Sequence, residues 1–376
     1  MHVLIGGAGA PNFGDELIVK NWIHYLCKDN EKCSPIVFEE NIKKNSENFH
    51  VSSLDRYQNV SFSDLLATLA KSRNSECFWT ALLRGYSFLE NKGLEVYGKE
   101  KFAHLINAET LHLHGGGYLN QSSIAKGFYI GVLAAIAKMT GARLVATGIG
   151  FLPQKFPEQK QLGVIQEAFS IFDVFECRDI ESYRFIADVA GNPTGLLFGL
   201  DDIYLSNVDQ YRLNCSPQKN LHLSFISYNV ESFTEEFWNR LSKFATKFDR
   251  VYFWESYPWQ DKKVFDLVKR KIIGVELLPV VDLVYGSIPF SPRDFVICAR
   301  FHVHFFGARV GASGYYHKDT KYYDVKHGSI KDRGSAFREF SSSTVFEYFS
   351  GVSSISRFDS IYQNDKKMLA DYIYDI

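Results

Sequence analysis

Short apolar runs alternate with longer amphipathic stretches along the first half of the chain. The first run, Val3–Gly6, leads through a glycine-containing loop into a stretch with an apolar stripe at helical spacing, formed by Ile18, Trp22, Tyr25 and Leu26. This order predicts a strand–loop–helix unit whose helix packs on a sheet. Further strands are expected at Ile36–Glu39, Thr110–Gly115, Leu144–Gly150 and Val174–Cys177, with helices from 62–105 flanking the sheet.

The alternation returns after a polar, irregular stretch between Leu200 and Asn220. We therefore predict an α/β protein with mainly parallel sheets and two domains, residues 1–205 and 206–376, with the last helix packing back on the first domain. Two similar halves imply a cleft, and parallel sheets bind ligands at the carboxyl ends of their strands. In the second half, strands are expected at Leu221–Ile226, Val251–Trp254 and Phe295–Ala299, and helices near Glu235–Thr246 and His302–Ala308.

Composition narrows the class of protein. A chain of 376 residues with 46% hydrophobic content can bury two cores of ordinary size. Its formal net charge of -1 gives no general attraction to nucleic acid or to an anionic membrane. Any anion site must therefore be local, and we expect no nucleic-acid partner. The 32 Phe and 21 Tyr residues are expected mainly to fill the cores, with some of them lining a sugar site.

The six cysteines show no CxxC pair and no metal-ligand spacing, so we expect reduced, buried thiols and no metal site. The N-terminus has no basic stretch followed by a long apolar run. No segment reaches about 18 uncharged apolar residues, the length that a membrane-spanning helix needs. We expect a cytoplasmic protein, with peripheral contact to the inner face of the membrane as the one membrane role left open.

The loop Gly7–Glu16 resembles two phosphate-binding fingerprints and satisfies neither. A dinucleotide-binding loop that starts at Gly7 needs a third glycine where Asn12 stands, and a P-loop needs Gly-Lys-Ser/Thr where Gly14-Asp-Glu stands. Asp15 and Glu16 suit the dipole at a helix start but would repel a phosphate. The loop is expected either to contact a neutral, hydroxyl-rich ligand or only to cap the helix with its acids.

Three later strand ends carry candidate chemistry. The glycines of His114-Gly-Gly-Gly117 allow backbone N–H groups to approach an oxyanion, or allow tight packing, and His114 suits either a core or a site. Arg178 can present its donor fork to a carboxylate or phosphate, or can pair with Glu176, Asp179 or Glu181, in which case Asp179 or Ser182 caps the next helix. Arg300 and His302 place a fixed cation beside a group that exchanges protons near neutral pH, although His302 could instead cap the turn.

Aromatic and basic residues interleave at 315–318 and 321–327, which we expect to form a lip of the cleft rather than a nucleic-acid footprint.

Read in order, these clusters resemble the polysaccharide pyruvyl transferase family. The resemblance runs from residue 3 to about residue 327, and no single motif carries it alone. The motifs are Gly9-Ala-Pro-Asn-Phe-Gly-Asp-Glu16, His114-Gly-Gly-Gly117, Ala146-Thr-Gly-Ile-Gly150, Arg178-Asp-Ile-Glu-Ser182 and Arg300-Phe-His302.

The resemblance implies two Rossmann-like domains facing across a cleft, as in the GT-B arrangement. It also implies transfer of the enolpyruvyl group of phosphoenolpyruvate onto a sugar of a surface polysaccharide or its precursor, with lipid-linked glycans among the acceptors. Phosphate is released and a pyruvate ketal forms, with phosphoenolpyruvate as co-substrate and without a cofactor or a metal.

The resemblance also assigns roles to individual residues. His302 is the candidate acid and Asp15 the candidate base. The donor would be held by Arg178, Arg300, Gly116 and Gly117, and the acceptor by Asn12, His114 and Lys326.

The chain departs from the family pattern at two places. Ala312 stands where proline is usual, and Leu200-Asp-Asp202 lacks the common Asp-Pro, so these aspartates receive no role.

Three other classes remain open. A GT-B glycosyltransferase with a nucleotide-sugar donor would have the same architecture. A nicotinamide-dependent oxidoreductase gains support from Glu39-Glu40, where a ribose-binding acid belongs, and is opposed by the missing third glycine. A non-catalytic sugar-binding or scaffolding protein would keep its function without Arg300 and His302.

Overall fold

The computed structural model describes residues 1–7, 9, 12–28, 34–39, 58–61, 77–208, 218–286, 290–351 and 353–375, with backbone alone for residues 39 and 58–61. The chain divides into two compact units. The first consists of Met1–Ala10, Asp15–Leu205 and Asp365–Ile376, and the second of Pro11–Gly14 and Ser206–Asn364. A short N-terminal segment thus belongs to the second unit, and the end of the last helix belongs to the first.

The first unit contains a seven-stranded sheet in which all strands pair in parallel. Its order is β3-β2-β1-β4-β5-β6-β7, so the strand order reverses between β1 and β4. This is the doubly wound Rossmann order, in which ligands bind at the carboxyl ends of the two strands that flank the reversal. The strands are β1 His2–Ile5, β2 Ile36–Glu39, β3 Gln58–Ser61, β4 Thr110–Leu113, β5 Arg143–Ile149, β6 Phe172–Cys177 and β7 Leu196–Phe198.

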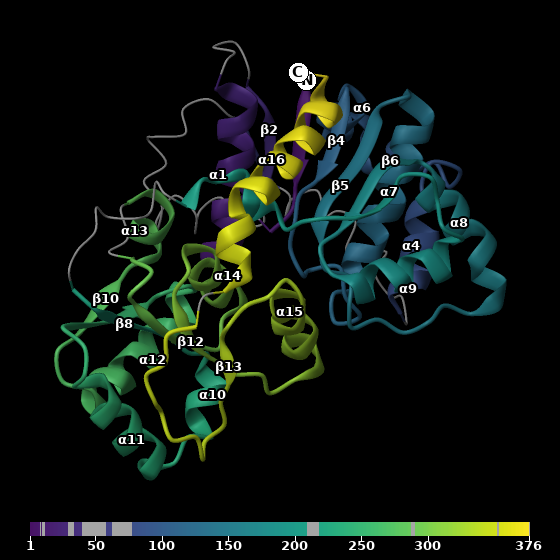
Figure 1. Ribbon diagram of the computed structural model, residues 1–376. Coiled ribbons are helices and arrows are strands. Elements are labelled where there is room, and N and C mark those ends of the chain that lie inside the picture. The colour runs from purple at the N-terminus through teal and green to yellow at the C-terminus, as the bar shows by residue number, and fades with distance from the viewer. Residues whose placement is uncertain are drawn as a thin grey trace. The chain divides into compact units, whose positions relative to one another are not determined.

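Helices cover both faces of this sheet (Figure 1). Alternating residues of β1 point to opposite faces: Val3 and Ile5 join the larger core, and Leu4 joins the core under α1 and the end of α16. The predicted stripe of α1 is confirmed, because it is buried in this second core. The helices are α1 Phe13–Cys27, α4 Phe78–Tyr86, α5 Gly93–Tyr97, η2 Lys99–Phe102, α6 Ala103–Ile106, α7 Ile124–Thr140, η3 Gln159–Gln161, α8 Leu162–Ser170, α9 Ile180–Ala190 and η4 Asp202–Leu205.

The second unit repeats the pattern with a six-stranded sheet in the order β10-β9-β8-β11-β12-β13. Its strands also pair in parallel, and the order reverses between β8 and β11. Both units therefore have a Rossmann-like topology with one reversal each. The strands are β8 Asn220–Ser224, β9 Arg250–Trp254, β10 Val275–Leu278, β11 Phe295–Cys298, β12 Ser313–Tyr316 and β13 Arg338–Glu339.

Aromatic side chains dominate the core of the second unit. One face of its sheet packs against α11 and α12 through a cluster that includes Phe237, Trp238 and Phe244. On the other face Trp254 contacts Phe306 with 6.1 Å between ring centroids. The expectation that aromatics fill the cores is thus confirmed here. The helices are α10 Ser227–Glu231, α11 Glu235–Ala245, α12 Pro258–Lys271, α13 Val280–Tyr285, α14 Phe301–Val310, α15 Lys321–Asp332 and α16 Ser354–Tyr374.

The predicted α/β class with two Rossmann-like halves is confirmed, and one local prediction is wrong. Tyr315 and Tyr316 do not form an exposed lip, because they are buried in β12, a strand that the sequence reading missed between β11 and β13. Cys27, Cys177 and Cys298 are buried free thiols, whereas Cys77 is half-buried and accepts a hydrogen bond from the Thr80 N–H at the start of α4.

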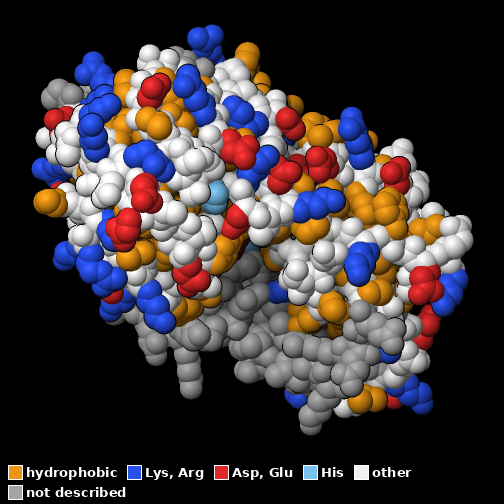
Figure 2. Space-filling model, turned by 90° about the horizontal axis from the view of Figure 1, so that it is seen from below, with side chains coloured by type: hydrophobic (Ala, Val, Ile, Leu, Met, Phe, Trp, Pro, Cys, Tyr) orange, Lys and Arg blue, Asp and Glu red, His pale blue; other side chains and the backbone are white. Residues whose placement is uncertain are grey.

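On the face shown in Figure 2, Lys and Arg side chains are interspersed with Asp and Glu, as a formal net charge of -1 allows.

Candidate functional site

The strand-order reversal of the first unit lies beside the first glycine loop. Asp15, in the first turn of α1, is flanked by two glycines: a Cβ atom at Gly7 would lie 2.9 Å from its Cγ, and one at Gly116 would lie 3.6 Å from its Oδ1. Gly7 follows β1 and Gly116 follows β4, the two strands that flank the reversal. The predicted base is therefore placed at the binding edge of this sheet.

Glu16 decides what the first loop can bind. Its side chain is buried, and its Oε1 accepts a hydrogen bond from the Gly9 N–H at 2.9 Å. In a phosphate-binding loop this type of backbone donor faces the ligand. Here the chain's own carboxylate occupies this donor, and what the loop binds stays a prediction.

The second glycine loop is fixed to its neighbour rather than open. The N–H of Gly116 donates to the Gly148 carbonyl at 3.4 Å, and its own carbonyl accepts from the Gly150 N–H at 2.9 Å. Gly117 accepts a hydrogen bond from Asn120 Nδ2 at 2.7 Å. The predicted donor contacts of Gly116 and Gly117 stay predictions, but the Gly116 N–H would have to leave a backbone partner to meet an anion.

The ring of His114 is fully buried, and its predicted contact with the acceptor stays a prediction. A Cβ atom at Gly6 would lie 2.1 Å from its Cε1, so the imidazole fills the space beside that glycine. Burial lowers the pKa of His114 to about 4, which keeps the ring neutral at pH 7. Its ring nitrogens have no hydrogen-bond partner among the described residues.

Arg178 is buried in an ion pair. Its Nη1 lies 2.7 Å from Oδ2 of Asp201, and both side chains are 3% exposed. This partner was not among the acids considered from the sequence, because Asp201 lies after β7 and had received no role. Asp179 caps α9 as expected, since its Oδ1 accepts from the Ser182 N–H at 2.7 Å. The printed contact with Asp201 uses one of the two terminal nitrogens of the guanidinium, and donor binding by Arg178 stays a prediction.

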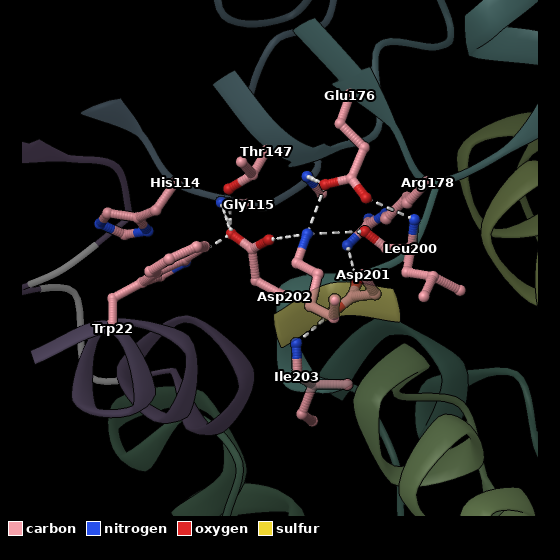
Figure 3. Close-up of polar contacts among 12 residues, drawn as sticks. Trp22, His114, Gly115, Thr147, Glu176, Arg178, Leu200, Asp201, Asp202 and Ile203 are labelled. Carbon is pink, nitrogen blue, oxygen red and sulfur yellow. Dashed lines mark hydrogen bonds and ion pairs between the residues drawn. The ribbon is translucent and has the colours of Figure 1, made fainter. Parts of the chain in front are cut away.

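Asp202, the neighbour of Asp201, is the centre of a buried polar network in the first unit (Figure 3). It is fully buried, and its Oδ2 accepts from three elements. The donors are Trp22 Nε1 in α1 at 2.9 Å, the Gly115 N–H after β4 at 2.6 Å and Thr147 Oγ1 in β5 at 2.8 Å. This carboxylate thus holds the base of the glycine loop that begins at Gly115.

The network continues to Lys366 of α16, also fully buried. Its Nζ lies 2.5 Å from Oδ1 of Asp202 and pairs with Oε2 of Glu176 in β6. Burial alone would raise the pKa of Asp202, but the charge of Lys366, followed by His112, lowers it to about 2. Burial raises the pKa of Glu176, which accepts from the N–H groups of Gly148 and Leu200. Sequence reasoning missed this cluster, although an acid inside the apolar run Phe-Glu-Cys of β6 was a signal for it.

In the second unit, Arg300 stands at the carboxyl end of β11, beside the reversal between β8 and β11. Its side chain is 12% exposed and pairs through Nη2 with Asp261, a fully buried acid of α12. Burial raises the pKa of Asp261, and Arg300 opposes that rise. The Arg300 Nε is buried without a hydrogen-bond partner among the described residues, so part of its donor capacity is unused there.

His302 lies two residues further on, in the first turn of α14, and packs against the N-terminal segment. A Cβ atom at Gly14 would lie 1.6 Å from its Nδ1, so only glycine fits there. The segment is anchored by a hydrogen bond from the Phe13 N–H to the Ser256 carbonyl at 2.8 Å. Asn12 accepts from the Gly14 N–H at 3.1 Å and thereby shapes the turn. Two motifs that are distant in sequence, Asn-Phe-Gly and Arg-Phe-His, therefore meet in the second unit.

Aromatic residues with one lysine border this edge. Lys326 of α15 lies over the rings of Tyr322 at 4.0 Å and Phe301 at 5.7 Å. Burial and then Tyr323 raise the pKa of Tyr228, while Arg300 opposes the rise. The structure thus brings Lys326 to the Arg300 end of the second unit, and its predicted contact with the acceptor stays a prediction.

Other candidate groups can be stated briefly. Glu40 and the side chain of Glu39, on which the nicotinamide alternative depends, lie outside the described residues. Among the described residues, no group of three or more His, Cys, Asp or Glu could hold a metal ion. Within the same ranges, no helix combines the length and apolar character needed to cross a bilayer.

Comparison with known proteins identifies the class of fold. No protein-family model and no curated protein matches the chain. Solved structures do match over its whole length at low identity. UDP-N-acetylglucosamine 2-epimerase from Rickettsia bellii has a TM-score of 0.51 and 13% identity, covering 100% of this chain and 98% of its own. The corresponding epimerase from Methanocaldococcus jannaschii has a TM-score of 0.51 and 10% identity, covering 98% and 99%.

A third match is Anabaena Alr3699/HepE, solved with UDP and glucose, with a TM-score of 0.51, 10% identity and 100% coverage of both chains. At such identities the matches show the fold alone: this chain has the two-domain α/β fold of the GT-B class.

Proposed function

We propose that this protein transfers the enolpyruvyl group of phosphoenolpyruvate to a sugar and closes a pyruvate ketal. The observation that carries the proposal is the meeting of two motifs of the resembled family in the second unit, where Gly14 gives room for the ring of His302 beside Arg300. That edge is a strand-order reversal, the usual ligand position of such a sheet.

The charge of the donor also supports this assignment. Phosphoenolpyruvate carries about three negative charges in a small volume and needs bidentate cations. In the first glycine loop the Gly9 N–H donates a hydrogen bond to Glu16, whereas Arg300 has a buried Nε without a hydrogen-bond partner among the described residues. In this proposal Arg300 holds the donor anion and Asp261 orients the guanidinium.

The reaction needs an acid and a base. Protonation of the methylene carbon, with His302 as the proposed acid, creates an oxocarbenium centre at the adjacent carbon. A sugar hydroxyl attacks that carbon and loses its proton to Asp15, the proposed base. Phosphate then leaves with the electrons of its C–O bond, and a second hydroxyl closes the ketal with loss of its proton. The proposed steps use no metal and no cofactor.

The acceptor is proposed to be a glycan of surface polysaccharide synthesis, or its lipid-linked precursor. Asp15 between Gly7 and Gly116 offers a carboxylate that suits a sugar hydroxyl and repels a phosphate. A cytoplasmic location with contact to the inner face of the membrane would suit such an acceptor.

Glycosyl transfer from a nucleotide sugar is the second candidate. The fold comparisons favour it, because the matched structures are two UDP-N-acetylglucosamine 2-epimerases and a protein solved with UDP and glucose. The residue motifs favour pyruvyl transfer. Both reactions require an enzyme that binds an anionic donor, so the released product distinguishes them.

The test is incubation with phosphoenolpyruvate and a panel of lipid-linked and nucleotide-linked glycans, followed by phosphate release and by mass spectrometry of the acceptor. Pyruvyl transfer adds one pyruvate less one water to the acceptor. Arg300→Lys and His302→Asn should abolish this gain, whereas Arg293→Lys, an exposed arginine of the same unit, should not. Release of a nucleoside diphosphate from a nucleotide sugar, without consumption of phosphoenolpyruvate, would establish the second candidate instead.

A further inference from the structure

A chain of buried hydrogen bonds runs through the second unit directly behind Arg300. Ser335 Oγ lies 2.8 Å from Nε2 of His304, and Nδ1 of His304 lies 3.0 Å from Nδ1 of His327. The Nε2 of His327 lies 3.2 Å from the carbonyl oxygen of Ala299, the residue before Arg300. The Phe337 N–H donates to Ser335 Oγ at 3.2 Å and begins the chain.

The two ends of this chain fix the position of every proton in it. A carbonyl oxygen only accepts, so His327 donates from Nε2 and its Nδ1 is the acceptor. His304 must then donate from Nδ1, which leaves its Nε2 to accept from Ser335. The Ser335 hydroxyl therefore donates to His304 Nε2, while its oxygen accepts from the Phe337 N–H. Each link agrees with its neighbours, so the chain has a single direction, from Phe337 to Ala299.

The surroundings keep both imidazoles neutral and in place. His304 and His327 are fully buried. Burial lowers the pKa of His327 to about 3, and burial followed by His327 lowers the pKa of His304 well below its ordinary value. The ring of His304 stacks on Tyr316 at 4.9 Å and on Phe337 at 4.5 Å between ring centroids.

The hydrogen-bond chain ends at Ala299, the residue before Arg300 of the proposed donor site. The Ala299 N–H donates to the Ser224 carbonyl at 2.7 Å and its oxygen accepts from His327, so both polar groups of this peptide residue are held. Tyr323 stacks on His327 at 5.9 Å. The same tyrosine hydrogen-bonds Tyr228, whose pKa responds to the charge of Arg300. His327 is therefore linked by a hydrogen bond to the residue before Arg300, and through Tyr323 to Tyr228.

We propose that His327, with His304 and Ser335 behind it, is a positioning residue that sets the Arg300 guanidinium for anion binding. None of the three touches the reacting atoms. The proposal deepens the proposed function and rests on its assignment of Arg300, but its first readout needs no substrate.

A pair of near-isosteric variants isolates the hydrogen bonds. In His327→Gln the amide can donate to the Ala299 carbonyl and accept from His304, whereas His327→Met fills a similar space and does neither. We expect His327→Gln to retain catalysis and His327→Met to lower kcat/KM about tenfold, mainly through KM for phosphoenolpyruvate, as loss of roughly one net hydrogen bond predicts.

Nitrogen-15 NMR supplies the readout without substrate. In the wild type at pH 7 we expect His327 to be protonated at Nε2 and His304 at Nδ1. The Nε–H resonance of Arg300, assigned by its loss in Arg300→Lys, should move in His327→Met and stay in His327→Gln. An unchanged Arg300 resonance in His327→Met, or equal behaviour of the two variants, would overturn the proposal.

Two further controls keep the outcomes separate. If the wild type consumes no phosphoenolpyruvate, the proposed function fails, and the Arg300 resonance still decides the positioning role. If His327→Met does not fold, as judged by circular dichroism, Ser335→Ala replaces it. That variant removes only the first side-chain donor and should move the Arg300 resonance in part, and no movement would overturn the proposal.

Discussion

Replacing Lys366 by methionine should destabilise the first unit through its carboxylates rather than through lost packing. The lysine side chain is fully buried, and methionine fills a similar volume, so little apolar contact is lost. What disappears is the ammonium group 2.5 Å from Asp202 Oδ1 and paired with Glu176. The variant leaves two buried carboxylates without their cation.

The size of the effect follows from the way in which the variant can relieve this charge. At least one of the two carboxyl groups must take up a proton. For an acid whose ordinary pKa is 3.8, protonation at pH 7 costs about 1.4 kcal/mol for each pH unit above that pKa, or about 4 kcal/mol. Removal of one partner from a buried ion pair costs about 3–5 kcal/mol, which agrees. For a unit of this size we expect a Tm lower by roughly 10 °C.

The dependence on pH gives the sharper test. In the wild type the pKa of Asp202 is about 2, below its ordinary 3.8, so its stabilising contribution is complete above pH 3.8 and is lost as the pH falls through 2. In Lys366→Met burial raises that pKa, so protonation becomes easier in acid. The difference between the two proteins should therefore be largest at pH 7 and shrink by about 1.4 kcal/mol per pH unit toward pH 4.

Urea unfolding at pH 7, 6 and 5, followed by circular dichroism, measures this difference. Lys367→Met is the matched control, since Lys367 is the exposed neighbour in α16 and should change stability by less than about 0.5 kcal/mol. The reasoning is refuted if the two variants are equally stable at pH 7, or if the deficit of Lys366→Met grows on acidification.

Three further predictions concern the glycine beside His302, the buried imidazoles and the indole of Trp22. Gly14→Ala should displace the ring of His302, lower turnover more than about tenfold and lower the free energy of unfolding by about 1–3 kcal/mol through overpacking. Gly328→Ala, at a position with open space in α15, should raise the free energy of unfolding by about 1 kcal/mol. Steady-state kinetics and urea unfolding check both variants. The pKa of His327 is about 3 in the folded protein, so as the pH falls the imidazole takes up a proton in the unfolded chain before it does in the folded one. Between pH 7 and pH 5 this difference should lower the free energy of unfolding by about 2 kcal/mol. Urea titrations of His327→Gln should not show this contribution. Trp22→Phe deletes one donor to Asp202 and should lower the free energy of unfolding by about 1–3 kcal/mol, measured in the same way.

The sequence predicted those helices and strands whose apolar residues recur with a local period. Strands such as Val251–Trp254 and the stripe of α1 follow from apolar periodicity. The motifs that contain Gly7, Gly116 and Arg300 proved to lie beside the reversals of the two sheets. Their position follows from the parallel order, which puts the carboxyl ends of neighbouring strands at one edge.

The polar interior was not predictable in the same way. Asp202 accepts from Trp22, which is 180 positions away in sequence, and pairs with Lys366 from the last helix. No local period relates such residues, and because this chain lacks the Asp-Pro that is common in the resembled family, its two aspartates had received no role. The buried lysine was likewise invisible, because the expectation that the last helix packs back on the first domain does not say which of its polar residues become buried.

In the first loop, a hydrogen bond seen in the structure explains two sequence features that point in opposite directions. Its glycines suggest an anion site, and its acids argue against one; the hydrogen bond from Gly9 to Glu16 reconciles them, because the loop carries its own anion. A donor with about three negative charges would then find its cations elsewhere, and Arg300 at the edge of the second sheet is one with donor capacity left. Asp15, one residue before Glu16 and set between Gly7 and Gly116, remains the carboxylate that can meet a hydroxyl. Gly14 belongs to the second unit, where a Cβ atom would lie 1.6 Å from Nδ1 of His302, so a glycine is required there beside the ring that we propose as the acid.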